Sequence, residues 1–219
     1  MRAALFDFDG TLADTAADLG AALNRMRADR SQPALPVEML RRYASSGARG
    51  LLRAGFGLAP EDASYEAMRD EFLAYYSAAI CVHTRLFAGM EELLSTLESR
   101  GIVWGIVTNK AMRFTTPLVE QLGLAARAGC VVGGDSTPHL KPHPASLLLA
   151  ARLIELEPRE CCYVGDDLRD IQAAKAAGMY SVAVEYGYHG ADNGEPSGWQ
   201  AEAVIGAPLE LVPHLRPRS

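Results

Sequence analysis

The chain has 219 residues, of which 49% are hydrophobic and 22% charged, and its formal net charge is −6. This composition is typical of a globular protein, and the length allows one large domain or one domain carrying an insert. The acidic balance argues against a nucleic-acid-binding protein, which would carry a basic surplus. No apolar run approaches the ~20 residues of a membrane span, and a charge follows the N-terminus too soon for a signal peptide. We therefore expect a cytoplasmic protein with no nucleic-acid or membrane partner.

The cysteines favour a reducing compartment. None of the four belongs to a Cys-x-x-Cys pair, and Cys161 and Cys162 are adjacent. Cys130 and these two lie in stretches that we expect to be buried strands. Small buried thiols fit this pattern better than a disulfide or zinc framework does.

Short apolar runs, each bounded by glycine or a polar turn residue, recur along the chain and indicate buried strands. Helical patterns lie between them. Strands that alternate with helices are typical of α/β proteins with a parallel, doubly wound sheet covered on both faces. In chain order the expected elements are strand 3–6, helix 90–99, strand 102–107, helix 115–122, strand 130–132, helix 144–156, strand 161–164, helix 170–177, strand 181–184 and a short strand at 203–205.

A long stretch after the first strand breaks this alternation. It contains no strand-like run, and apolar residues such as Leu19 and Leu23 follow helical spacing. The stretch is too long for an ordinary connection within a compact sheet domain. We therefore predict an inserted all-helical cap domain at residues 15–84 and an α/β core domain formed by residues 1–14 and 85–219.

Polar side chains follow four of the expected strands, at the point where each strand ends. Ligands of parallel sheets bind beyond the carboxyl ends of the strands, so we expect these side chains to meet in one crevice. They are Asp7 and Asp9 after the first strand, Thr108, Asn109 and Lys110 after the second, Lys141 in the loop after the third, and Asp166, Asp167 and Asp170 after the fourth.

The acidic residues of this crevice require a cation. Asp7, Asp9, Asp166, Asp167 and Asp170 could not all ionise there unaided, because close like charges raise each other's pKa. Magnesium prefers oxygen ligands and leaves positions for substrate phosphate oxygens, whereas the His and Cys ligands that zinc favours are missing from the crevice. We therefore expect Mg²⁺ as the cofactor.

The remaining polar groups suit a phosphate monoester, which is a dianion. Lys141 offers an ammonium group, Thr108 a hydroxyl, and Asn109 a further backbone N–H donor. Asp7 is nearest to its strand end and is expected to be the nucleophile that forms an aspartyl-phosphate. Asp9, two residues on, can face the leaving oxygen and exchange protons with it.

Four segments resemble the motifs of the haloacid dehalogenase superfamily in their usual order. The resemblance implies a Rossmann-like core with a helical cap, Asp7 as nucleophile and Asp9 as acid and base. It also implies Mg²⁺ held by Asp7, the Asp9 carbonyl and Asp166, with Asp170 nearby. The presence of Asp9 favours phosphoryl chemistry over dehalogenation. The segments are residues 7–11, 107–109, 141–142 and 165–170.

Within that superfamily the chain is similar to the phosphoglycolate phosphatase group and to bacterial N-acetylmuramate 6-phosphate phosphatases. One departure is His143, where relatives often carry Asp. This resemblance implies hydrolysis of a small phosphate ester that also bears a carboxylate, namely N-acetylmuramate 6-phosphate or 2-phosphoglycolate. The segments that carry it are residues 45–49, 104–110, 165–171 and 186–188.

Arg49 is the candidate for recognising that carboxylate, because Arg pairs well with carboxylates. Small residues surround it at positions 46–50, as in a turn that faces a substrate, although an exposed arginine at a helix start would look the same. Three neighbours of the motifs have simpler interpretations too. Thr108 could be a helix N-cap, Asp167 could face solvent, and we expect Lys110 on the solvated first turn of its helix.

Two other functions share these features. A sugar-phosphate mutase has the same core and cap but returns the phosphoryl group to a bound intermediate. A phosphorylation-switched receiver domain also combines acidic residues, a Thr and a Lys, with Asp135 as its expected phosphorylation site. However, the spaced acidic pair after the first strand and the helical insert do not suit a receiver. No residue pattern sets the oligomeric state, and we expect a monomer.

Overall fold

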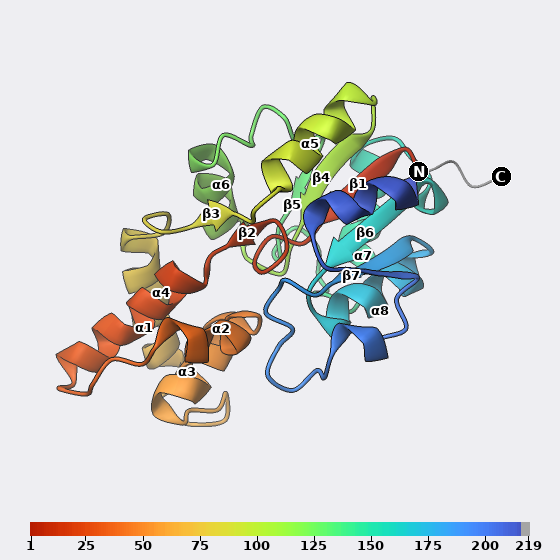
Figure 1. Ribbon diagram of the computed structural model, residues 1–219. Coiled ribbons are helices and arrows are strands. Elements are labelled where there is room, and N and C mark those ends of the chain that lie inside the picture. The colour runs from red at the N-terminus through yellow and green to blue at the C-terminus, as the bar shows by residue number, and fades with distance from the viewer. Residues whose placement is uncertain (216–219) are drawn as a thin grey trace.

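The computed structural model of the chain describes residues 1–215 and contains a six-stranded parallel sheet (Figure 1). The strand order is β5-β4-β1-β6-β7-β8, so the first strand lies in the middle of the sheet. This is the predicted doubly wound α/β architecture. The strands are β1 (Ala3–Phe6), β4 (Val103–Val107), β5 (Val131–Val132), β6 (Cys161–Gly165), β7 (Tyr180–Val184) and β8 (Ala203–Ile205).

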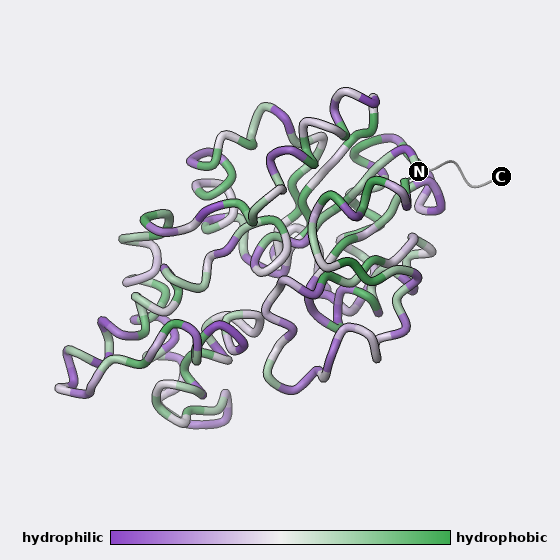
Figure 2. Tube along the Cα trace, in the orientation of Figure 1, coloured by the Kyte–Doolittle hydropathy of each residue, from purple (hydrophilic) through white to green (hydrophobic). Residues whose placement is uncertain are grey.

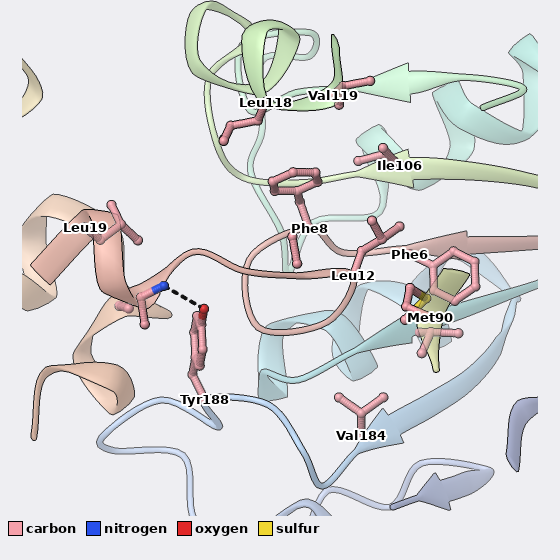
Figure 3. Close-up of a cluster of buried hydrophobic side chains, with 14 of the residues drawn as sticks. Phe6, Phe8, Leu12, Leu19, Met90, Ile106, Leu118, Val119, Val184 and Tyr188 are labelled. Atoms are coloured by element: carbon pink, nitrogen blue, oxygen red, sulfur yellow. Dashed lines mark hydrogen bonds between the residues drawn. The ribbon is translucent and has the colours of Figure 1, made fainter. Parts of the chain in front are cut away.

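Helices cover both faces of this sheet. Alternate residues of β1 belong to two separate buried clusters: Ala4 and Phe6 pack with α5 and α6, whereas Ala3 and Leu5 pack with α7 and α8. Figure 3 shows Phe6 in the first cluster, close to Met90 of α5. The helices are α5 (Met90–Ser99), α6 (Met112–Gln121), α7 (Ala145–Leu153) and α8 (Leu168–Ala177), with 3₁₀ helices at Pro158–Glu160, Pro196–Gly198 and Pro208–Leu215.

Hydropathy follows this layering. All four residues of β1 and all five of β6 are buried. Figure 2 shows the central strands largely in the hydrophobic colour, while many turns between elements are hydrophilic. The four cysteines are free thiols, of which three are buried. Within residues 1–215, no helix combines the length and apolarity that a membrane crossing needs.

Four helices occupy the predicted insert and pack on one another beside the sheet (Figure 1). A two-stranded antiparallel pair, which the sequence did not indicate, joins the two ends of the insert through Ala13 with Leu86 and Asp14 with Arg85. The boundaries of a separate cap domain stay a prediction. The elements are β2 (Ala13–Asp14), α1 (Ala16–Asp29), α2 (Val37–Ala44), α3 (Gly47–Phe56), α4 (Tyr65–Ala78) and β3 (Arg85–Leu86).

Three helix limits differ from the predicted ones, two because of capping side chains and one because of backbone geometry. Helix α6 begins three residues early because the Asp135 carboxylate accepts the Met112 N–H at 2.8 Å. Helix α8 begins at Leu168 because Asp167 is its N-cap and forms a capping box with Asp170. Helix α7 ends before its predicted limit, at Leu153, and Glu155 just beyond it has a φ of 55°, which breaks helical geometry.

Tyr188, in the loop after β7, fixes the start of the insert. Its hydroxyl accepts the N–H groups of Thr15 (2.7 Å) and Ala16 (3.0 Å) and donates to Asp14 Oδ1 (2.8 Å). Figure 3 shows this hydroxyl reaching a backbone nitrogen at the first turn of α1. The first turn of the insert is therefore bound to the sheet domain through one phenol.

Tyr188→Phe should destabilise the fold, because it leaves the Thr15 N–H without its partner and removes one of two partners from the Ala16 N–H and from Asp14 Oδ1. We expect a loss of about 1–3 kcal/mol in the free energy of unfolding, measured by urea denaturation. Tyr43→Phe is the control, since the Tyr43 hydroxyl makes no hydrogen bond within residues 1–215, and it should change stability by less than about 0.5 kcal/mol. Equal effects of the two substitutions would contradict this account.

Candidate active site

The central strand brings the predicted site residues to one edge of the sheet. Phe6 is in register with Ile106 of β4 on one side and with Val164 of β6 on the other. Asp7 follows directly, and its N–H still donates to the Val164 carbonyl at 2.9 Å. The side chains that follow all three strands therefore emerge next to one another.

Three of the predicted carboxylates form a tight cluster. Asp7, Asp166 and Asp170 each offer an oxygen, and these oxygens lie within 4.8 Å of one another. Asp166 and Asp170 are each only 1% exposed. The structure thus brings together carboxylates from the residue after β1, the residue after β6 and the first turn of α8.

Lys141 inserts its ammonium into this cluster. Its Nζ lies 3.0 Å from Asp7 Oδ1 and 2.7 Å from Asp170 Oδ1. Burial by itself would lower the pKa of this ammonium, but the carboxylates of Asp170 and Asp7 outweigh that effect and raise the pKa above its usual value. Lys141 therefore carries a full positive charge where a phosphate would meet Asp7.

Asn109 and Tyr163 hold Lys141 in place. The Asn109 side chain accepts the Lys141 N–H at 2.8 Å and donates to the Lys141 carbonyl at 3.1 Å. The Tyr163 hydroxyl accepts from Lys141 Nζ at 2.7 Å and donates to the Val107 carbonyl. The Asn109 amide is thus engaged with protein, which leaves its backbone N–H for the predicted contact with substrate.

Asp9 lies apart from the cluster of side-chain oxygens. Its Oδ1 accepts from Lys110 Nζ at 2.7 Å and from the Thr15 hydroxyl. The prediction of a solvated Lys110 is wrong, since its side chain is only 9% exposed. Lys110 precedes α6 and extends toward Asp9, because the opposite charge there compensates for the loss of water.

Two other simple interpretations are wrong. Thr108 is not an N-cap, because α6 begins at Met112 and its N-cap residue is Ala111. The Thr108 hydroxyl instead accepts the Lys110 N–H at 3.2 Å. Asp167 does not face solvent, being 3% exposed. Its carboxylate accepts from the side chains of Arg169 and Ser45.

Arg169 had no predicted role, yet it joins the sheet domain to the insert. Its Nη2 donates to the Ser45 carbonyl at 2.9 Å, beyond α2. The same guanidinium pairs with Asp167 at 2.8 Å. The sequence gave no sign of the contact between Arg169 and Ser45, because the two residues are more than a hundred positions apart.

A cavity of about 600 Å³ opens over these groups and extends between the sheet and the insert. Arg49, in the first turn of α3, lines the same cavity as Asp7 and is exposed. Phe72 and Tyr76 of α4 line the cavity too. The lining residues include Asp7, Asp9, Thr108, Asn109, Lys110 and Lys141 from the sheet side, and Leu19, Arg49, Phe72, Leu73 and Tyr76 from the insert.

Comparison with known families identifies the scaffold. Residues 4–184 match the model of the haloacid dehalogenase-like hydrolases. The chain belongs to this family. The match spans β1 to β7 and therefore includes all four motifs and the insert.

Individual relatives of this hydrolase are named as phosphatases. The chain is 44% identical to an N-acetylmuramic acid 6-phosphate phosphatase of Pseudomonas putida, over 96% of this chain and 94% of that protein. It is 43% identical to a phosphoglycolate phosphatase of Xanthomonas campestris, again over 96% and 94%. The expected enzyme class, a phosphatase that acts on phosphate esters, is confirmed.

Solved structures share the fold of this hydrolase. One is described as a predicted phosphoglycolate phosphatase from Haemophilus somnus and superimposes with a TM-score of 0.86 at 24% identity. The alignment covers 99% of this chain and 98% of that one. The sheet and the inserted helices therefore form an arrangement that recurs in other proteins.

Asp166 is a buried carboxylate with no positively charged partner among the described residues. Burial raises its pKa well above the usual value, and the negative charges of Asp7 and Asp170 add to this effect. Its hydrogen-bond donors within the described chain are neutral, the Thr11 hydroxyl and the Tyr188 N–H, each at 2.8 Å. A divalent cation among these oxygens would balance a charge that Lys141 does not reach, so the donor set fits such an ion.

Glycines leave the space that this carboxylate occupies. A Cβ on Gly10 would lie 2.1 Å from Asp166 Oδ2, and Gly10 has a φ of 83°. A Cβ on Gly187 would lie 2.2 Å from the Asp166 Cβ. Both positions therefore require glycine, the first for its backbone geometry as well as for space.

The raised pKa of Asp166 predicts that the metal-free protein loses stability as the pH rises. An unfolded Asp ionises near pH ~3.9, whereas the folded one stays protonated to a higher pH. Folding therefore takes up a proton between the two pKa values, and the free energy of unfolding falls as pH rises through that window. Asp166→Asn, which cannot ionise, should show a smaller fall between pH 5 and pH 8 in EDTA. Parallel pH profiles for the two proteins would refute this.

Proposed function

We propose that this phosphatase is magnesium-dependent, forms an aspartyl-phosphate on Asp7, and hydrolyses a phosphomonoester that also carries a carboxylate. The position of Lys141 beside Asp7 carries the proposal. Asp7 Oδ1 is held by Lys141 at 3.0 Å and by the Phe8 N–H at 2.7 Å. Asp7 Oδ2 has no hydrogen bond within residues 1–215 and lines the cavity, which suits a nucleophile.

The proposed reaction has two steps. Asp7 Oδ2 attacks phosphorus, the bond from phosphorus to the ester oxygen breaks, and Asp9 gives its proton to the departing alkoxide. Asp9 then takes a proton from water as that water attacks the phosphorus of the aspartyl-phosphate, and the bond between phosphorus and Asp7 Oδ2 breaks. Inorganic phosphate leaves and both carboxylates return to their starting states. Lys141 remains charged throughout and stabilises the negative charge on the transferring group.

Asp7, Asp166 and Asp170, with the Asp9 carbonyl, are the proposed ligands of Mg²⁺. Their donors are all oxygen, the type this hard cation prefers. When bound, Mg²⁺ would neutralise charge in the cluster and polarise a phosphoryl oxygen. Asp170 is also paired with Lys141 at 2.7 Å, so it serves both cations.

The cavity favours the larger of the two candidate substrates, N-acetylmuramate 6-phosphate. Its volume of about 600 Å³ exceeds the need of a two-carbon ester such as 2-phosphoglycolate. Apolar side chains of Phe72, Leu73 and Phe114 line it and suit the acetyl and lactyl methyl groups of the sugar. Relatives named for each substrate are 44% and 43% identical to this chain. Identity therefore does not separate the candidates, and the cavity size supports the larger one.

Asp7→Asn should lose nearly all turnover, because an amide oxygen cannot replace the carboxylate as nucleophile. We expect kcat to fall by about four orders of magnitude or more, measured by release of inorganic phosphate. Asp135→Asn is the control: Asp135 lies outside the cavity and caps α6, a role that Asn fulfils. Near-normal turnover by Asp7→Asn would refute the proposed nucleophile.

Product analysis of the wild type distinguishes hydrolysis from a mutase reaction, in which the phosphoryl group returns to the bound intermediate. Free phosphate formed in proportion to the alcohol supports the phosphatase. A rearranged sugar phosphate without free phosphate would instead indicate a mutase. A stable phosphate on Asp135 would indicate a receiver.

Arg49→Ala should weaken binding of substrates that carry a carboxylate. A charge-assisted hydrogen bond contributes about 1.5–3 kcal/mol, so KM for N-acetylmuramate 6-phosphate should rise about tenfold or more. KM for 4-nitrophenyl phosphate, which has no carboxylate, should change little. Arg53→Ala is the matched control, since Arg53 lies on the same helix but pairs with Asp192 outside the cavity. Equal rises in KM for both substrates would exclude the role of Arg49.

A further inference from the structure

Lys110 lies between the sheet domain and the insert, in contact with both. Its Nζ is 2.7 Å from Asp9 Oδ1 and 2.8 Å from the hydroxyl of Tyr76, which belongs to α4. The ammonium also lies 4.7 Å from the centre of the Tyr76 ring. One cation thus connects Asp9 with a side chain from the inserted helices.

The Tyr76 hydroxyl has little other purpose where it lies. The residue is 2% exposed, and its ring packs between Phe72 and Phe114, with ring centres 6.4 Å and 5.8 Å away. A phenylalanine would fill this aromatic site equally well. The hydroxyl adds one hydrogen bond within the described residues, and that bond goes to Lys110.

These contacts leave Asp9 with one oxygen fixed and one oxygen open. Lys110 and Thr15 both donate to Oδ1. Oδ2 accepts no hydrogen bond within residues 1–215, and Asp9 lines the cavity. A carboxylate held through one oxygen cannot rotate freely about its side-chain bonds, so its second oxygen keeps a constant direction.

We propose that Tyr76 and Lys110 are positioning residues that aim Asp9 at the leaving oxygen. Tyr76 fixes the Lys110 ammonium, and Lys110 fixes Asp9 Oδ1, so that Oδ2 meets the ester oxygen of the substrate. The inserted helix α4 then helps to orient the proton donor Asp9 in addition to enclosing the substrate. This inference rests on the proposed role of Asp9 as acid and base.

Leaving groups of different basicity test the inference. An alkoxide needs a proton to depart, whereas 4-nitrophenolate leaves without one, so a misaligned Asp9 slows only the first. Lys110→Met should lower kcat/KM for N-acetylmuramate 6-phosphate or 2-phosphoglycolate about a hundredfold, within the usual range for general acid catalysis. The same variant should lower kcat/KM for 4-nitrophenyl phosphate by less than about tenfold. Tyr76→Phe should show the same selectivity with a smaller loss.

Matched variants and a double mutant complete the test. Lys175→Met, an exposed lysine on α8, should leave both rates unchanged. Lys110→Met combined with Tyr76→Phe should be no slower on the alkyl ester than Lys110→Met alone, because Tyr76 acts through Lys110. Equal losses on both substrates would overturn the proposal, since direct phosphate binding or misfolding affects both alike.

Asp9→Asn distinguishes failure of this inference from failure of the function on which it rests. It should show the strongest selectivity against the alkyl ester. If Asp9→Asn is selective and Lys110→Met is not, the positioning role is wrong while Asp9 remains the acid. If Asp9→Asn slows both substrates equally, Asp9 is not the acid, and the inference falls with it.

Discussion

The buried ion pairs of Lys141 hold the whole site together. Three carboxylates meet at the end of the central strands, where burial and close like charges raise the pKa of Asp166 and Asp170. The Lys141 ammonium opposes this rise at Asp170. The ammonium lies 2.7–3.0 Å from Asp170 and Asp7. The Tyr163 hydroxyl accepts a hydrogen bond from it, and the Asn109 amide holds the Lys141 backbone. These two supports come from β6 and the end of β4, which flank β1. The sheet order itself therefore sets the position of the charge.

The residues that line the strand ends could be predicted because parallel strands leave little freedom. A buried apolar run followed by Asp7 must place that carboxylate at the edge of the sheet, whatever the details of packing. Asp166 follows β6, which lies beside β1, and Lys141 lies in the loop after β5, on the other side of β4. Their convergence at one sheet edge therefore also results from topology. Capping side chains were harder to foresee. Asp135 caps α6 through a contact with Met112, although α6 itself and β5 lie between the two residues in the chain. Sequence periodicity does not indicate such a partner.

Contacts between the sheet and the insert could not be predicted at all. Lys110 was expected in solvent because a lysine near a helix start is usually hydrated, yet Tyr76 and Asp9 enclose it. Ser45 and Asp167 likewise meet across more than a hundred residues. Helical spacing shows which face of α4 is apolar but not which element that face will meet. The insert side of the cavity, to which Arg49 belongs, is therefore the side that the sequence describes least.

Tyr188 has a mechanical consequence. Its backbone N–H holds Asp166 Oδ2 at 2.8 Å, while its hydroxyl holds the first turn of α1. One residue thus links the acidic cluster, through its backbone N–H, to the start of the inserted helices, through its hydroxyl. A tilt of those helices would therefore be transmitted to the loop whose N–H holds Asp166. If the insert moved to admit substrate, the same residue would couple that movement to the carboxylate of Asp166.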